Sequence, residues 1–86
     1  MEELTQTYLD RTNEVLTDVH RELHRAKTLF PAHFVNQHEA YAVILEEIDE
    51  LWDEIKKNQK NYDIEAQKKE AIQAAAMLIR FVVELT

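Results

Sequence analysis

The sequence predicts an all-α protein, because it lacks residues that other fold classes need and repeats its apolar residues at helical spacing. Glycine is absent and proline occurs once, at Pro31. Tight β-hairpins and glycine-rich phosphate loops depend on the permissive backbone of glycine, so a β-rich fold and a P-loop are excluded. The 86 residues form one domain, residues 1–86, which buries only about 60–65% of its unfolded surface. We expect three helices.

The first helix is predicted over about residues 2–28, within a segment 1–30. Its apolar residues recur at helical spacing and form a modest stripe: Leu9, Leu16, Val19, Leu23 and Phe30. The residue before a proline is disfavoured in the α region, so Phe30 and Pro31 should end this helix.

The second helix is predicted over residues 36–59. Asn36 and Glu39 have the spacing of a capping box, with asparagine in place of the usual serine or threonine. The apolar seam expected to face the core is Ile44, Ile48, Leu51 and Ile55.

The third helix is predicted over residues 63–85. The polar run KKNQKNYD, residues 56–63, contains the turn that precedes it, and Asp63 is its expected N-cap. Its segment AIQAAAMLIRFVV is apolar on most sides. Two neighbouring helices cannot cover such a surface, so we expect a helical bundle completed by homo-oligomerisation, most simply as an isologous dimer.

Charge and composition exclude several functions. The formal net charge is −7, which argues against a general nucleic-acid binder, since such proteins need a basic face. No apolar run is long enough for a membrane span, and we expect a cytoplasmic protein without membrane contact. Without cysteine, neither a disulfide nor a thiolate metal site is possible.

Two pairs of polar residues at i, i+3 are the main functional feature. Glu47 and Glu50 form one pair and Glu70 and Gln73 the other, and each pair lies on one face of its helix. In a hairpin turning near Lys60, Glu50 and Glu70 lie equally far from the turn, as do Glu47 and Gln73. The four side chains should therefore converge roughly 15–20 Å from the turn.

This convergence predicts a metal site. Three carboxylates at one height raise one another's pKa unless a cation is present. Hard divalent cations prefer such oxygen-rich sites, so we expect Mg²⁺ or Mn²⁺. Helical periodicity places Glu47 and Glu50 on the flank of the core and Glu46 on the outer side.

The segments HEAYAVILEEIDELWDEIKKNQ and KKEAIQAAAMLIRF resemble the MazG-type all-α nucleoside triphosphate pyrophosphohydrolases, whose motifs are EExxE and ExxD. The resemblance covers residues 38–83 and is closest to small single-module members carried by phages and their hosts. It implies hydrolysis of a (d)NTP to a monophosphate and pyrophosphate by a dimer or tetramer. By the same resemblance Glu47, Glu50 and Glu70 would hold the metal, and Glu46 would either support these ligands without touching the metal or orient water. Gln73 departs from the family, since it stands where the motif has aspartate, and it fits a weak metal ligand as well as a buried amide with its hydrogen bonds satisfied.

Cations and aromatic residues near these motifs are candidates for substrate binding. Groups that would assist the leaving pyrophosphate are Lys56, Lys57, Lys68, Lys69 and Arg80, and groups that would recognise the base are His38, Tyr41 and Trp52. Arg80 fits an oligomer-interface salt bridge as well as a phosphate clamp, and Trp52 fits core packing as well as base stacking.

His20 and His24 lie at i, i+4, but no third ligand is identifiable, so we expect exposed helix histidines.

Two functions follow. The first is a Mg²⁺- or Mn²⁺-dependent pyrophosphohydrolase that acts on nucleoside triphosphates. The second is a catalytically weakened or inactive MazG-like oligomer that binds a nucleotide or a protein partner. Because glutamine offers only a neutral oxygen to a metal, Gln73 favours the second, whereas Glu47, Glu50 and Glu70 favour the first.

Overall fold

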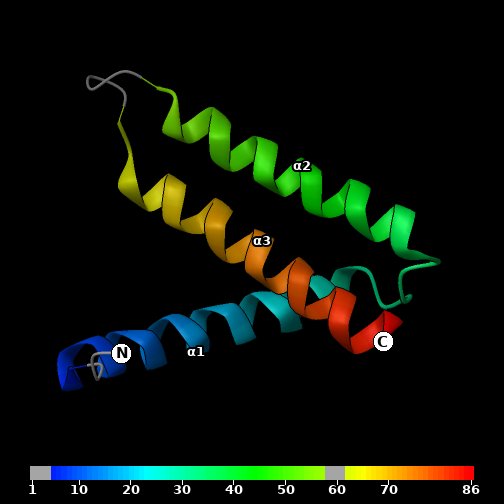
Figure 1. Cartoon of the computed structure of the whole chain (residues 1–86), viewed down its shortest axis with the longest axis horizontal. Helices are drawn as coiled ribbons and strands as arrows, with labels where there is room; N and C mark the ends of the chain where they lie inside the picture. Colours follow the sequence, from blue (N-terminus) through cyan, green and yellow to red (C-terminus); the bar gives the residue numbers. More distant parts are fainter. Residues whose placement is uncertain (1–4, 58–61) are drawn as a thin grey trace.

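The chain folds into three α-helices in a computed structural model that describes residues 5–57 and 62–86. These helices are α1 (Gln6–Leu29), α2 (Gln37–Ile55) and α3 (Ile64–Leu85). No strand occurs among the described residues, so the predicted all-α class is confirmed. Helices α2 and α3 run antiparallel as a hairpin, and α1 lies along the opposite side of α3 (Figure 1).

Helix α1 begins at Gln6 rather than near residue 2. Thr5 has an extended backbone, with φ −70° and ψ 157°, and its Oγ1 accepts a hydrogen bond from the Tyr8 N–H at 3.1 Å. The predicted helix was therefore wrong at Thr5, because this threonine N-cap was overlooked, and its predicted start at residue 2 lies outside the described residues. Helix α1 ends at Leu29, with Phe30 as its C-cap before Pro31, as predicted.

The cap predicted for α2 is confirmed. The Asn36 side chain accepts from the Glu39 N–H at 2.9 Å. In return, the Glu39 carboxylate accepts from the Val35 N–H at 3.0 Å, one residue earlier than in a standard capping box.

The hairpin ends of α2 and α3 differ in how well they were predicted. Helix α2 stops at Ile55, where Lys56 caps it, so the predicted extension was wrong at residues 56 and 57. The predicted turn centre, Lys60, lies outside the described residues. The Asp63 cap of α3 is confirmed, since its carboxylate accepts from the N–H groups of Glu65 and Ala66.

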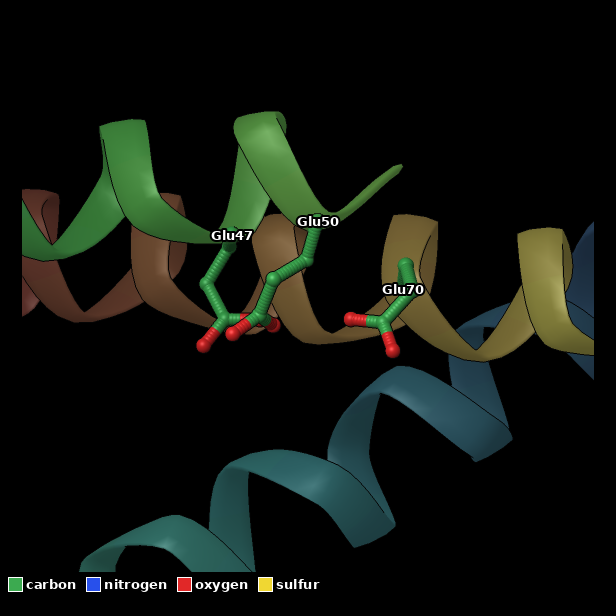
Figure 2. Close-up of side chains that lie close together, drawn as sticks. All are labelled: Glu47, Glu50 and Glu70. Carbon is green, nitrogen blue, oxygen red and sulfur yellow. The ribbon is translucent and has the colours of Figure 1, made fainter. Parts of the chain in front are cut away.

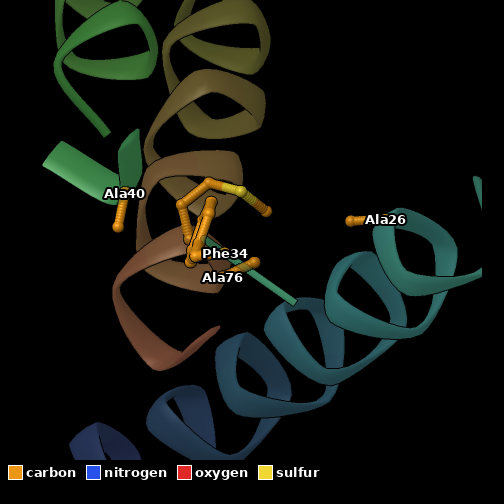
Figure 3. Close-up of a cluster of buried hydrophobic side chains, with 5 residues drawn as sticks. Ala26, Phe34, Ala40 and Ala76 are labelled. Carbon is orange, nitrogen blue, oxygen red and sulfur yellow. The ribbon is translucent and has the colours of Figure 1, made fainter. Parts of the chain in front are cut away.

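Helix α3 is the centre of the fold. It packs against both other helices, whereas α1 and α2 do not pack on each other within the described ranges. The buried cluster draws on all three helices and on the loop between α1 and α2 (Figure 3): Ala26, Phe34, Ala40, Ala76 and Met77. The three alanines allow the helices to approach closely, and Phe34 fills the space that remains.

A buried group of charged side chains fixes the loop between α1 and α2 to α3. Arg80 donates from Nε to Glu84 at 2.8 Å and from Nη2 to the Ala32 carbonyl at 3.0 Å. Glu84 also accepts from the Phe34 N–H at 2.7 Å and pairs with Lys27 at 3.2 Å. Arg80 further lies over the Phe34 ring, 4.4 Å from its centroid. The arginine thus forms its ion pair within the chain, not across an oligomer interface.

Only one of the two apolar faces of α2 is covered. Ile44 and Leu51 are partly buried, as the predicted seam required. Ile48 and Ile55 are 42% and 45% exposed, so that seam was wrong for them, and Trp52 is 56% exposed rather than in the core. We call the exposed face the outer stripe of α2: Tyr41, Leu45, Ile48, Trp52 and Ile55.

Exposed apolar side chains continue on the other helices. On α1 the predicted stripe is covered at Val19 and partly at Leu23, but Leu16 and Phe30 are exposed. On the C-terminal half of α3 the exposed apolar residues are Leu78, Ile79, Val82 and Val83. None of the described helices is both long and apolar enough to cross a membrane.

Candidate metal site

Three glutamates from two helices meet beside the hairpin. Each of Glu47, Glu50 and Glu70 offers a carboxylate oxygen, and these oxygens lie within 4.8 Å of one another. Figure 2 shows Glu47 and Glu50 on α2 and Glu70 on α3, with the carboxylates directed to the side where α1 runs. The convergence that the spacing predicts is therefore present, and it depends on the antiparallel register of α2 and α3.

Partial burial and the repulsion between neighbouring carboxylates raise pKa values in this cluster. Burial, the largest cause, and the neighbouring carboxylates of Glu50 and Glu70 together raise the pKa of Glu47 to about 7. Burial also raises the pKa of Glu70, as does a hydrogen bond with Glu50, while Lys69 opposes this shift. Near neutral pH the cluster therefore retains protons, which a divalent cation would displace.

Gln73 joins the two ends of the cluster. With its amide nitrogen facing the carboxylates, the orientation that satisfies its polar atoms, it donates to Glu70 at 2.9 Å and to Glu47 at 3.2 Å. Ligation of a metal would need the amide oxygen in that place, so the predicted ligand role of Gln73 requires the side chain to turn over. As a donor, Gln73 reduces the repulsion between the carboxylates of Glu47 and Glu70. A fourth carboxylate in its place would increase that repulsion.

Helix α1 brings two further charged residues to the site, Glu22 and Arg25, and neither was predicted from the sequence. Arg25 donates to both carboxylate oxygens of Glu22, from Nε at 2.8 Å and from Nη2 at 2.6 Å. The nearby Glu22 contributes to the raised pKa of Glu47, and the pKa of Arg25 is raised chiefly by Glu22 and to a lesser degree by Glu47. Their i, i+3 spacing was visible in the sequence, but nothing in it shows which face of α1 meets the hairpin.

An apolar pocket of about 530 Å³ adjoins the carboxylates. Its polar residues include Glu46 and Glu47 on α2 and Gln73 on α3. The apolar residues that line it come from all three helices and the first loop: Ala26, Phe30, Ala32, Phe34, Val35, Val43 and Met77. The pocket thus places an apolar volume directly beside a carboxylate site, an arrangement typical of small-molecule sites.

A second pocket, of about 630 Å³, lies between α1 and α3. Four cations line it: Arg21, Arg25, Lys68 and Lys69. Three acidic residues line it as well: Asp18, Glu22 and Glu65. The residues shared by this cationic pocket and the apolar pocket are Glu22, Arg25 and Gln73. The two pockets therefore meet beside the carboxylate cluster.

The predicted substrate-binding residues are distributed unevenly around these pockets. Lys69 lines the cationic pocket, and Arg80 lines the apolar pocket although its guanidinium is already bound to Glu84. His38 is exposed near the start of α2, and Trp52 lies on the outer stripe of α2. Among the described residues that line the two pockets, neither His38 nor Trp52 occurs.

Other candidate groups lie apart from the carboxylate cluster. Lys56 and Lys57 pair with Asp53 and Glu54 near the turn end of α2. Both His20 and His24 of α1 are exposed, as expected. Within residues 5–57 and 62–86, the metal-type cluster is the glutamate trio alone.

Comparison of the chain with protein-family models, with curated proteins and with solved structures found no match. The resemblance to the MazG-type family therefore stays a prediction that depends on the two motifs. The geometry of the site supports a function independently of that resemblance.

Proposed function

We propose that this protein is a Mg²⁺- or Mn²⁺-dependent nucleoside triphosphate pyrophosphohydrolase that converts a (d)NTP to a (d)NMP and pyrophosphate. The observation that carries the proposal is the glutamate trio, with oxygens within 4.8 Å of one another, beside an apolar pocket of about 530 Å³. A polyphosphate needs charge neutralisation, and a nucleoside needs an apolar volume next to it.

The donor set fits a hard divalent cation. Glu47, Glu50 and Glu70 supply carboxylate oxygens from two helices, and a cation would offset the burial and the carboxylate repulsion that raise the pKa of Glu47 to about 7. A bound Mg²⁺ would neutralise phosphate oxygens and increase the acidity of a water molecule.

The remaining residues would position the substrate and the water. The base and sugar would occupy the apolar pocket, where Phe34 and Met77 offer apolar surface. Glu46, exposed on the wall of this pocket next to Glu47, would orient the attacking water and accept its proton. The water oxygen bonds to the α-phosphorus as the bridging bond to the β-phosphate breaks, and pyrophosphate leaves with the electron pair.

We also infer that the chain acts as a homo-oligomer, a dimer or a tetramer, in the cytoplasm, where nucleotides are abundant. The outer stripe of α2 follows the alternating spacing of four and three that marks a helix-packing seam. A second copy of the chain that packs on this stripe and on the exposed end of α3 would complete a bundle of helices.

One observation favours a second candidate function, that of a catalytically weakened or inactive relative that binds a nucleotide or a protein partner. Gln73 donates to Glu47 and Glu70, so a neutral amide holds the cluster together without a metal. In such a protein the pockets would bind the ligand, but turnover would be slow or absent.

The test is a panel of ribo- and deoxyribonucleoside triphosphates with Mg²⁺ or Mn²⁺, scored for monophosphate and pyrophosphate. We expect turnover of at least one substrate, and a loss of about 100-fold or more in Glu47→Gln. Asp49→Asn is the matched control, because Asp49 is an exposed carboxylate two residues away on α2. Silence with both metals, in the wild type and in Gln73→Asp, would overturn the enzymatic proposal and leave the binding protein.

A further inference from the structure

The cationic pocket between α1 and α3 is unusual for this protein. The chain as a whole carries a net charge of −7, yet this pocket has four cations against three acidic residues. Ile72 is the one apolar residue among those that line it. A polar pocket with excess positive charge in an acidic protein suits an anionic ligand.

The position of the cationic pocket relative to the carboxylates matches the shape of a nucleotide. Gln73 and Arg25 line both pockets, and Gln73 donates to two of the carboxylates. A nucleoside triphosphate has an apolar end and a highly charged end, with the α-phosphate between them. If the base lies in the apolar pocket and the metal at the carboxylates, the β- and γ-phosphates extend into the cationic pocket.

Arg25 stands at the junction of the two pockets in an orientation fixed by Glu22. The fork of two hydrogen bonds to Glu22 uses Nε and Nη2, which leaves donors of the guanidinium free to bind another anion. The Glu22 side chain is largely buried, whereas the Arg25 side chain is 54% exposed. The largely buried Glu22 therefore fixes Arg25, whose half-exposed side chain lines both pockets.

Two lysines on α3 complete the cationic wall. Lys69 is adjacent to Glu70 in the sequence and electrostatically close to its carboxylate. Lys68 is paired with Asp18 of α1 at 3.5 Å, a long and partly exposed ion pair that a phosphate oxygen could replace.

We propose that Arg25 and Lys69 bind the β- and γ-phosphates of the metal-bound nucleoside triphosphate in the pocket between α1 and α3, with Glu22 positioning the Arg25 guanidinium. This proposal rests on the proposed function and adds to it the direction in which the substrate lies. It makes α1 the helix that distinguishes a triphosphate from a monophosphate, and the cationic pocket the place from which pyrophosphate leaves.

Binding of tripolyphosphate in the presence of Mn²⁺, measured by titration calorimetry, tests this subsite without a base or any turnover. We expect Arg25→Gln and Lys69→Gln each to weaken tripolyphosphate binding by about 10–100-fold, since each removes a charge-assisted contact. Binding of Mn²⁺ alone should be retained or strengthened, because neither residue belongs to the glutamate trio and each substitution removes a positive charge near it.

Arg11→Gln is the matched control for Arg25→Gln. Arg11 lies on the same helix, forms an i, i+3 ion pair with Glu14, and is 56% exposed. It lies about 21 Å further along α1 at the usual helical rise. The control should bind tripolyphosphate as the wild type does, and circular dichroism should show all variants folded.

Glu22→Gln tests the positioning role. This substitution should raise KM for the nucleotide and weaken tripolyphosphate binding while leaving kcat within about twofold. The reason is that it disturbs binding of the β- and γ-phosphates and not the α-phosphate that reacts. A merely structural role would lower the thermal stability without this separation of KM from kcat.

The proposal is overturned if Arg25→Gln and Lys69→Gln both bind Mn²⁺ and tripolyphosphate as tightly as the wild type. That result would leave the enzymatic function standing if the wild type hydrolyses nucleotides. Conversely, tripolyphosphate binding that depends on Arg25 in a protein without hydrolysis would support the subsite and reject the pyrophosphohydrolase.

Discussion

Two clusters of charged residues on the central helix use glutamate in opposite ways. At the C-terminal end of α3, Glu84 receives hydrogen bonds from Arg80 and from the Phe34 N–H and pairs with Lys27, and its pKa falls to about 2. Toward the other end of the helix, Glu70 meets Glu47 and Glu50, and the pKa of Glu47 rises to about 7.

The difference lies in the partners and not in burial alone. Both glutamates lose water, which by itself raises a carboxyl pKa. Around Glu84 the hydrogen bonds from Arg80 outweigh this desolvation, whereas around Glu47 the nearest charged groups are carboxylates. The first cluster is complete within the chain and stabilises the fold, whereas the second holds like charges that a cation would compensate.

The largest expected effect is on the completed cluster. Glu84→Gln leaves the buried Arg80 without its anionic partner, so the free energy of unfolding should fall by about 3–5 kcal/mol. The Glu84 side chain is only 2% exposed, which makes water a poor substitute. Urea denaturation measures this loss. Glu14→Gln, which breaks the exposed pair with Arg11, should cost less than about 1 kcal/mol, and equal losses in the two variants would contradict the account.

The acid dependence of stability should follow from the same group. Because the folded pKa of Glu84 is about 2 and its ordinary value is 4.5, its contribution is present above pH 4.5. That contribution is lost as the pH falls from 4.5 towards 2. At about 1.4 kcal/mol for each pKa unit, the loss amounts to about 3 kcal/mol. Urea midpoints measured across this range should drop more steeply in the wild type than in Glu84→Gln, and parallel curves would reject the assignment.

Some parts of the fold and of the site could be predicted because they depend on residues that are close in the sequence. The caps Asn36 and Asp63 and the stop before Pro31 are local signals, and all three are confirmed. The glutamate trio was predictable because two short spacings and one antiparallel hairpin determine it.

The parts that were missed depend on contacts between distant segments. Periodicity shows that α2 has apolar residues on two faces but not which face α3 covers. Ile48 was therefore placed in the core wrongly, and core packing, one of the two roles considered for Trp52, is not found. Glu22 and Arg25 were missed because the path of α1 across α3 is set by the first loop. That loop is held by Arg80 and Glu84, which bind the Ala32 carbonyl and the Phe34 N–H, 48 and 50 positions away in the sequence.

A smaller effect is expected when the incomplete cluster gains a fourth carboxylate. Gln73→Asp removes the amide that donates to Glu47 and Glu70 and adds a charged ligand, so the apparent affinity for Mn²⁺ should rise by about tenfold. Calorimetric titration with Mn²⁺ at pH 8 measures the change. A weakened enzyme would also gain activity in this variant. Unchanged or weaker Mn²⁺ binding would show that Gln73 does not occupy a ligand position.

The smallest effect is on the stability of the metal-free cluster. Because the folded pKa of Glu47 is raised to about 7 from 4.5, its charged form opposes folding, and stability should fall as the pH rises from 4.5 to about 7. Glu47 is only partly buried, so screening by solvent reduces the effect of this shift. Glu47→Gln should therefore raise the stability at pH 8 in the absence of metal by about 1 kcal/mol, or about 4–8 °C in Tm for a domain of this size. Added Mn²⁺ should raise the Tm of the wild type and leave that of Glu47→Gln nearly unchanged.

The matched control for that comparison is Asp49→Asn, on the exposed outer side of α2. It should retain the wild-type dependence on both pH and Mn²⁺. A Glu47→Gln variant that is less stable than the wild type at pH 8 without metal would contradict the view that the trio is repulsive.

The central claim is that Glu47, Glu50 and Glu70 form a site for a divalent cation. A crystal of the protein grown with Mn²⁺ and measured near the manganese absorption edge would test it most directly. We predict an anomalous peak that places a Mn²⁺ ion about 2.0–2.3 Å from oxygens of all three glutamates, the distance usual for oxygen ligands of such ions. The absence of a peak at this cluster with saturating Mn²⁺, or a peak bound only elsewhere on the chain, would contradict it.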